Sequence, residues 1–259
     1  MLETAILAAR RAGQELLAAW TGELEVLSED AGDIKLAMDR RAEDIILSAI
    51  RRRFPGHAIL SEERGRVQGA EFTWVVDPLD GTHNYSRHVP YWCVCVAAYH
   101  GNEPFLGVVY DPIHNHLFSA ERGKGAFLNG QPIRVNAERR LPQAVVAFGC
   151  YHKLENSVRS WMRRTQVITP AARSTRNFGA AGLHCAYAAA GWADAFVEYG
   201  VMPWDVGAGH AIVLEAGGRF ISWPVEDGGL DVVMGAPLVC EDLLALGLWR
   251  PAEESKPVL

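Results

Sequence analysis

Apolar residues near the N-terminus recur every third or fourth position, the spacing of an amphipathic helix. A helix is predicted over residues 2–20, and Gly22 ends it. A second helix is predicted from Asp39, which stands at the N-cap position, to Arg53, because a Phe-Pro-Gly run follows. The N-terminal fifth of the chain is therefore predicted to contain two amphipathic helices.

From residue 58 onward the pattern changes to the short apolar runs and turn dipeptides of β-strands. Gly101-Asn102 and Asn129-Gly130 stand where hairpin turns between antiparallel strands are expected. The expected strands cover residues 58–60, 72–76, 94–99 and 105–110, a segment around Leu117, and residues 133–135.

From Leu141 onward, predicted strands and helices alternate. Strands are expected at residues 144–148, 195–198 and 232–234, and helices at residues 155–164, in the Ala-rich run after Gly179, and at residues 204–216. This change divides the chain into an N-terminal α+β part, residues 1–140, and a C-terminal α/β part, residues 141–259. Because no linker-like composition lies at the boundary, the two parts are expected to share an extensive interface in one compact mixed α/β unit.

The composition is that of an ordinary globular domain. The 259 residues are 49% hydrophobic and 22% charged, and 25 Lys and Arg against 31 Asp and Glu give a formal net charge of −6. Without a basic excess, neither a nucleic-acid polymer nor an anionic membrane is expected as a partner.

The cysteines and the N-terminus indicate the compartment. Of the five cysteines only Cys93-x-Cys95 form a close pair, which a strand places on one face, so buried side chains in a reducing compartment are expected and a metal site is not. Glu3 and Arg10-Arg11 interrupt the first apolar run, so no signal peptide is predicted and a cytoplasmic location is expected.

Candidate chemistry concentrates after the apolar strand that ends at Val76. The run Asp77-Pro78-Leu79-Asp80-Gly81-Thr82 places two acids at a strand end, where their mutual repulsion favours a cation between them. Carboxylate and carbonyl oxygens are ligands that Mg²⁺ prefers, and the helical turn opened by Gly81-Thr82 offers free backbone N–H groups to a phosphate. Taken alone, the segment also fits a capped surface turn.

Two further acid clusters stand at the ends of predicted elements. Glu62-Glu63 follow a short apolar strand, and Asp205 opens the helix predicted at residues 204–216. Asp205 alone fits an N-cap. Three such clusters in one chain favour a shared cation site over three independent structural roles.

Together these motifs resemble the inositol monophosphatase family of Mg²⁺-dependent, Li⁺-sensitive phosphatases, and the match runs from the first helix to about residue 248. The resemblance implies a layered αβαβα sandwich, usually assembled as a homodimer. It implies two or three Mg²⁺ ions, and Gly81 and Thr82 in contact with the phosphate. The metal ligands that it implies are Glu62, Asp77, the Leu79 carbonyl, Asp80 and Asp205.

The resemblance also assigns roles in the reaction. Asp77 is expected to bridge two ions, with Glu62 on the ion that activates the attacking water and Asp80 and Asp205 on the other. Asp39 is expected to orient that water together with Thr82. Before Asp39, Lys35 and Leu36 stand where family members usually have Val and Thr; Lys35 is expected on the surface, with an approach to the anionic site as the alternative.

The expected substrate contacts lie in the C-terminal part. Gly179, Ala180 and Ala181 take the place of a family run that usually contains Ser or Thr, a difference that argues against myo-inositol 1-phosphate itself. Glu198 stands where a glutamate holds substrate hydroxyls in inositol phosphatases; the alternative is a surface charge on an edge strand.

The predicted function is hydrolysis of a small phosphomonoester, such as a polyol or sugar phosphate, by a phosphatase with Mg²⁺-activated water. Related alternatives are histidinol-phosphate phosphatase, fructose-1,6-bisphosphatase and adenosine 3′,5′-bisphosphate nucleotidase. A non-enzymatic alternative is a family member that binds a phosphorylated ligand or serves as a scaffold.

Overall fold

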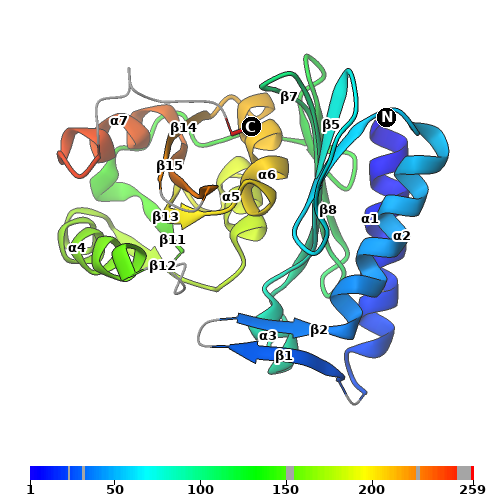
Figure 1. Ribbon diagram of the computed structural model, residues 1–259. Coiled ribbons are helices and arrows are strands. Elements are labelled where there is room, and N and C mark those ends of the chain that lie inside the picture. The colour runs from blue at the N-terminus through cyan, green and yellow to red at the C-terminus, as the bar shows by residue number, and fades with distance from the viewer. Residues whose placement is uncertain (23, 31–32, 150–154, 226–227, 250–257) are drawn as a thin grey trace.

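Five layers of helices and sheets make up the structure, a computed structural model that describes residues 1–22, 24–30, 33–149, 155–225, 228–249 and 258–259. In Figure 1 the helices α1 and α2 cover the outer face of an eight-stranded sheet, and α5 and α6 lie between that sheet and a five-stranded one. The helices α4 and α7 cover the far side of the second sheet. The predicted layered αβαβα sandwich is confirmed.

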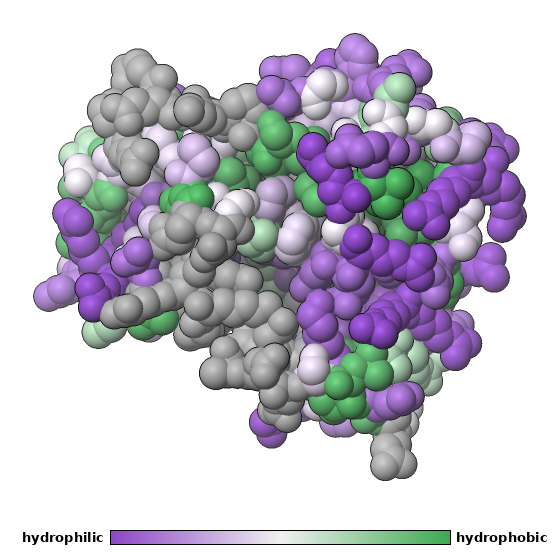
Figure 2. All heavy atoms as spheres, in the orientation of Figure 1, coloured by the Kyte–Doolittle hydropathy of each residue, from purple (hydrophilic) through white to green (hydrophobic). Residues whose placement is uncertain are grey.

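The first layer differs from the prediction at the start of the second helix. The helix α1 spans Leu2–Ala19, and α2 spans Ala37–Arg53, so α2 begins before Asp39. An unpredicted antiparallel hairpin, β1 (Val26–Asp30) and β2 (Asp33–Leu36), joins the two helices. Since β2 runs directly into α2, Asp39 is the third helical residue and not the N-cap. The outer face of this layer is largely hydrophilic (Figure 2).

The eight-stranded sheet contains the strands predicted between residues 58 and 135. Its order is β10-β9-β8-β7-β6-β5-β3-β4, with β3 and β5 parallel and all other neighbours antiparallel. The last strand lies two residues earlier than expected. The strands are β3 (Ala58–Ser61), β4 (Gly65–Val67), β5 (Phe72–Asp80), β6 (Cys93–His100), β7 (Glu103–Asp111), β8 (His116–Glu121), β9 (Ala126–Leu128) and β10 (Gln131–Ile133), and the short helix α3 (Thr82–Ser86) follows β5.

The five-stranded sheet has the order β12-β11-β13-β15-β14. Its strand β11 is parallel to β12 and β13, whereas β15 is antiparallel to β13 and β14. The strands β12 and β14 and the helix α7 were not predicted. The elements are η1 (Leu141–Gln143), β11 (Val145–Phe148), α4 (Glu155–Ala171), β12 (Ser174–Arg176), α5 (Ala181–Ala189), β13 (Ala195–Val201), α6 (Pro203–Glu215), β14 (Arg219–Pro224), β15 (Leu230–Gly235) and α7 (Pro237–Ala245). The expected division near residue 140 lies between the two sheets and stays a prediction.

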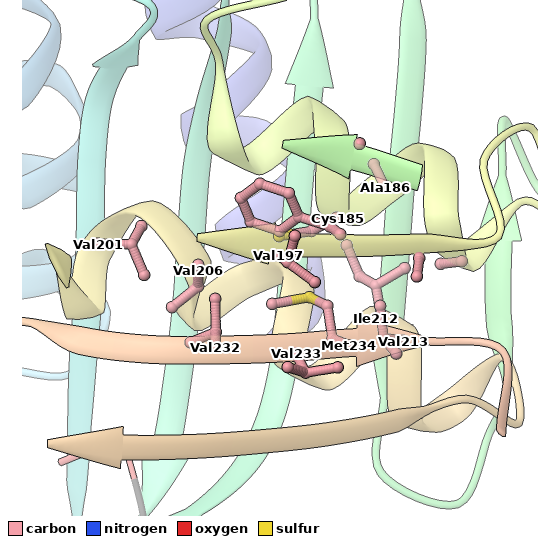
Figure 3. Packing of buried hydrophobic residues seen from close by; sticks show 14 of the residues in the cluster. Cys185, Ala186, Val197, Val201, Val206, Ile212, Val213, Val232, Val233 and Met234 are labelled. Carbon is pink, nitrogen blue, oxygen red and sulfur yellow. The ribbon is translucent and has the colours of Figure 1, made fainter. Parts of the chain in front are cut away.

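Each face of the large sheet packs against its own apolar core. Because side chains alternate along a strand, Trp74 and Val76 of β5 face the α1–α2 core while Val75 faces the core shared with α5 and α6. Figure 3 shows that second core, in which side chains of β13, β15, α5 and α6 meet, among them Val197 and Met234. Its members include four buried free cysteines, as expected; they are Cys93, Cys95, Cys185 and Cys240, and Cys150 lies outside the described residues.

The middle helices lie unusually close to their neighbours, which accounts for their Gly- and Ala-rich sequence. A Cβ atom at Gly107 of β7 would lie 2.1 Å from the carbonyl oxygen of Ala208 in α6, and one at Gly209 would lie 2.2 Å from Cys185 Cβ in α5. Only glycine permits these approaches. Within the described part of the chain, no helix is both long and apolar enough to cross a bilayer.

Candidate active site

The end of β5 forms the centre of the site. Asp77 and Asp80 both belong to this strand, and the pairing register with β6 shifts between them. The Asp77 carboxylate accepts a hydrogen bond from the Leu79 amide (3.0 Å), and the Thr82 hydroxyl donates to the Leu79 carbonyl (2.9 Å). Gly81 turns the chain with a φ of 90°, a left-handed conformation that favours glycine. The bulge therefore brings both acids and the Leu79 carbonyl to one end of the strand.

Asp80 is held by the N-terminus of α5. Its two carboxylate oxygens accept hydrogen bonds from the amides of Ala181 (3.1 Å) and Gly182 (2.7 Å), and the Cys93 thiol lies 3.3 Å away. A Cβ atom at Gly182 would lie 2.4 Å from the Cys95 sulfur, so this position requires glycine. The packing role of Gly182 could not be predicted from the sequence, because it depends on how α5 packs against β6.

The helix α6 brings the third acid to the same point. Asp205 is the third residue of α6, and its carboxylate accepts a hydrogen bond from the Met202 amide (2.8 Å). Asp205 and Asp77 lie close enough to affect each other's pKa, since each is a cause of the shift of the other. Asp205 is therefore not the N-cap, which is Met202, but it accepts a bond from the N-cap amide and also belongs to the acid cluster.

The turn after β3 carries Glu62 and Glu63 and is fixed on three sides. The Glu62 amide donates to the Val76 carbonyl of β5 (3.3 Å), and Lys35 of β2 forms an ion pair with Glu63 (2.8 Å). Arg64 forms an ion pair with the fully buried Glu43 of α2 (2.9 Å). Lys35 was expected on the surface, with an approach to the anionic site as the alternative. Its ion pair with Glu63 supports the alternative.

Asp39 of α2 lies close enough to this turn for Glu62 and Glu63 to raise the pKa of its carboxyl group. It is buried, and its Oδ2 accepts a hydrogen bond from the Leu36 amide (2.7 Å). Its Oδ1 is buried without a hydrogen-bond partner among the residues that the structure describes. A buried, unsatisfied carboxylate oxygen is costly unless a ligand or water satisfies it. Thr82, its expected partner, donates to Leu79 instead.

The carboxyl groups of the site favour protonation. Burial, followed by repulsion from Glu62 and other acids, raises the pKa of Asp77 well above its usual range, and burial also raises the pKa of Asp205. Burial raises the pKa of Asp80 to about 6, although the hydrogen bonds from the α5 amides lower it. Burial raises the pKa of Asp39 to about 8, and Glu62 and Glu63 add to the increase. Without a compensating cation, such groups hold protons.

Glu198 is part of the same electrostatic environment. Burial and, secondarily, Asp80 raise the pKa of its carboxyl group to about 8. The strand β13 continues to Val201 and lies between β11 and β15, so the predicted strand end and the edge-strand surface charge are both wrong. A Cβ atom at Gly149 would lie 1.6 Å from Glu198 Oε2, which shows that the carboxylate rests against this glycine.

The expected substrate run precedes α5. Gly179 has a φ of 81°, and the Asn84 amide donates to the carbonyls of Phe178 (2.7 Å) and Tyr91 (2.8 Å), which ties this run to α3. Ala180 is the N-cap of α5. The amide of the next residue, Ala181, already donates to Asp80.

The donor set fits a hard divalent cation. The buried carboxylates of β5, the half-buried Asp205 of α6, the Leu79 carbonyl and the orphaned Asp39 oxygen are oxygen donors of the kind Mg²⁺ prefers. Ligand atoms of Asp80, Cys93 and Cys95 also lie within 4.8 Å of one another. Burial raises the pKa of the Cys93 thiol, so this pair stays protonated and is a poor ligand for a soft metal.

Comparison with known proteins decides the family. A model of the inositol monophosphatase family matches residues 1–249. The chain belongs to the inositol monophosphatase family.

Members of this family with known structures share the whole fold. The suhB extragenic suppressor protein of Bartonella henselae is 32% identical, with a TM-score of 0.86 over 93% of this chain and 95% of the other. The inositol monophosphatase of Anabaena is 31% identical, with a TM-score of 0.82 over 96% of each chain. Escherichia coli Nus factor SuhB is 34% identical over 252 residues, 95% of this chain and 94% of the relative.

Proposed function

We propose that this protein is a Mg²⁺-dependent phosphatase of a small phosphomonoester, such as a polyol or sugar phosphate. One observation carries the proposal: the buried Asp77 and Asp80 interact electrostatically with the half-buried Asp205, and the causes that act on the three pKa values include no cationic side chain of the described residues. Buried acids without a countercharge are unfavourable unless the site binds a cation. Family membership adds a reaction that uses such a cation.

The proposed metal ligands are Glu62, Asp77, the Leu79 carbonyl, Asp80 and Asp205. Bound Mg²⁺ would neutralise phosphate charge and make water a better nucleophile at neutral pH. Asp77 would be the ligand that two ions share, a role supported by the electrostatic effect of Glu62, Asp80 and Asp205 on its pKa. The backbone amides of α5 hold Asp80 in place.

The remaining residues would bind and orient the reactants. In this proposal Asp39 uses its free oxygen to accept a hydrogen bond from the attacking water, and Thr82 completes that contact after its hydroxyl turns from Leu79. The amides of Gly81 and Thr82 would contact the phosphate. Glu198, with Gly179, Ala180 and Ala181, would contact the rest of the substrate, and the buried carboxylate suits hydroxyl donors.

Assembly and inhibition are part of the same proposal. As the resemblance implies, we expect two or three Mg²⁺ ions per chain, inhibition by Li⁺, and a homodimer. Analytical ultracentrifugation and a Li⁺ titration of the activity test the last two.

The alternatives are of two kinds. Histidinol phosphate, fructose 1,6-bisphosphate and adenosine 3′,5′-bisphosphate are substrates that the same acid cluster would serve. A binding or scaffolding role without catalysis draws support from the name of the Escherichia coli relative, Nus factor. Ala180 stands where the family usually has Ser or Thr, which favours a substrate other than myo-inositol 1-phosphate.

The test is phosphate release from a panel of phosphomonoesters with and without Mg²⁺. The panel contains inositol phosphates, histidinol phosphate, fructose 1,6-bisphosphate, adenosine 3′,5′-bisphosphate and p-nitrophenyl phosphate. We expect turnover of at least one ester that requires Mg²⁺ and stops with chelator. Ligand binding without turnover of any ester would favour the binding role instead.

A further inference from the structure

Lys35 brings a positive charge to one side of the acid cluster. It lies on β2, a strand that packs beside α3, and its ammonium group is 2.8 Å from Glu63 Oε1. The Glu63 side chain is only 5% exposed, whereas that of Lys35 is 33% exposed. An ion pair with one buried partner is screened by solvent less than a surface pair.

This charge acts on the site and not only on Glu63. Lys35 lowers the pKa of Asp39, while Glu62 and Glu63 raise it. Among the described residues, no other cationic side chain is a cause of the shifted pKa values of Asp39, Asp77, Asp80, Glu198 or Asp205. Lys35 therefore partly balances the negative charge of the Glu62–Glu63 turn.

We propose that Lys35 is a tethered cation that supplies positive charge beside Glu62 and Glu63, so that it stabilises the metal-free site and weakens the binding of divalent cation there. The proposal rests on the Mg²⁺ site of the proposed function and makes Lys35 a positioning residue. An ammonium on Glu63 and a divalent cation on the neighbouring Glu62 repel each other, so the charge of one lowers the affinity for the other.

The main test is Mg²⁺ binding to metal-free protein, measured by isothermal titration calorimetry without substrate. Lys35→Met should bind Mg²⁺ about 5- to 50-fold more tightly than wild type, the range that Coulomb's law gives for these charges several ångströms apart in a partly exposed site. Its metal-free form should melt at a lower temperature. Lys35→Arg keeps the charge and should bind Mg²⁺ as wild type does.

Two further variants separate charge from general damage. Lys124→Met removes a lysine that forms an ion pair with Glu121 on β8, away from the acid cluster, and should leave Mg²⁺ affinity unchanged. Glu63→Gln leaves the Lys35 charge uncompensated and should weaken Mg²⁺ binding. In the double variant Lys35→Met/Glu63→Gln, both charges are gone and affinity should return toward that of wild type.

The outcomes distinguish this inference from the proposed function. Wild-type protein without measurable Mg²⁺ binding would overturn both. Clear wild-type binding that Lys35→Met leaves unchanged or weakens would overturn the role of Lys35 alone, as would a gain of affinity that Lys124→Met reproduces.

Discussion

The two sides of the acid cluster compensate their negative charge in different ways. On the β2 side, Lys35 pairs with Glu63 and lowers the pKa of Asp39. On the α5–α6 side, Asp80 and Asp205 receive backbone amides from the starts of two helices, and no cationic side chain of the described residues is a cause of their pKa shifts. The first side is compensated by a side-chain charge, whereas the second relies on backbone dipoles.

This difference indicates how each side would respond to a cation. Helix N-termini contribute only partial charges, so the ionised forms of Asp80 and Asp205 are not fully compensated and the α5–α6 side should depend most on bound metal. The β2 side is already part-neutralised by Lys35 and should bind metal more weakly. Substitutions at the centre and on the α5–α6 side are therefore expected to cost the most activity.

The largest effect is expected from Asp77→Asn, because Asp77 joins the two sides. Loss of the shared charge should lower kcat by at least about 10⁴-fold, a change of several kcal/mol in metal-assisted stabilisation of the transition state. Phosphate release and thermal melting measure activity and folding. Asp242→Asn, which alters an ion pair with Arg140 at α7, is the control and should keep full activity. Near wild-type turnover of Asp77→Asn would contradict the claim that Asp77 joins the two sides of the acid cluster.

A smaller but still large effect is expected from Thr82→Ala. The hydroxyl that now donates to Leu79 would be lost, and with it the proposed contact to the attacking water. Loss of a proton-transfer contact should lower kcat by about 10²–10⁴-fold with Mg²⁺ affinity retained. Thr82→Ser keeps the hydroxyl and should stay close to wild type. If Thr82→Ala raises only KM, the residue binds substrate.

Gly182→Ala tests the backbone support on the α5–α6 side. The added methyl group would meet the Cys95 sulfur at 2.4 Å, so α5 must shift and the amide bond to Asp80 should weaken. Overpacking of this kind costs about 1–3 kcal/mol of unfolding free energy, measured by urea denaturation. At Gly56 nothing lies within 4 Å of an added Cβ, so Gly56→Ala serves as the control. Equal stability of both variants would contradict the close packing described here.

Glu198→Gln should have the smallest and most selective effect. Loss of a charged hydrogen-bond acceptor for substrate hydroxyls should reduce transition-state binding by about 1–3 kcal/mol. The kcat/KM for the polyol substrate should therefore fall roughly 5- to 150-fold. Turnover of p-nitrophenyl phosphate, which has no such hydroxyls, should be spared. Equal losses for both esters would assign Glu198 to the metal site instead.

The sequence predicted the layers and the acid positions better than the contacts between them. Asp77 and Asp80 are recognisable because they interrupt a buried strand, and Asp205 because it opens a helix. The β1–β2 hairpin was missed because its residues lack a regular apolar alternation, and with it the place of Lys35. For Glu198 the sequence left a surface charge on an edge strand open as the alternative to a substrate contact, because strand order cannot be predicted locally; β13 is a central strand.

Other features depend on tertiary packing that no local pattern reports. Gly182 resembles any helix-start glycine until α5 is seen against Cys95. Asp39 reads as an N-cap because β2 was not expected to run straight into α2. The ion pair of Arg64 with Glu43 joins a turn to a helix face 21 residues away along the chain.

The central claim, that these acids form a cation site, is tested most directly by thermal stability against pH with and without Mg²⁺. The pKa of Asp80 is raised to about 6 and those of Asp39 and Glu198 to about 8, so folding favours their neutral forms. Their contribution is complete below the unfolded values near 4 and is lost as pH rises toward 8. The stabilisation by Mg²⁺ should therefore grow from pH 5 to pH 8.5, reaching roughly 5 °C or more. A Mg²⁺ effect that is absent, or equal at every pH, would contradict the account.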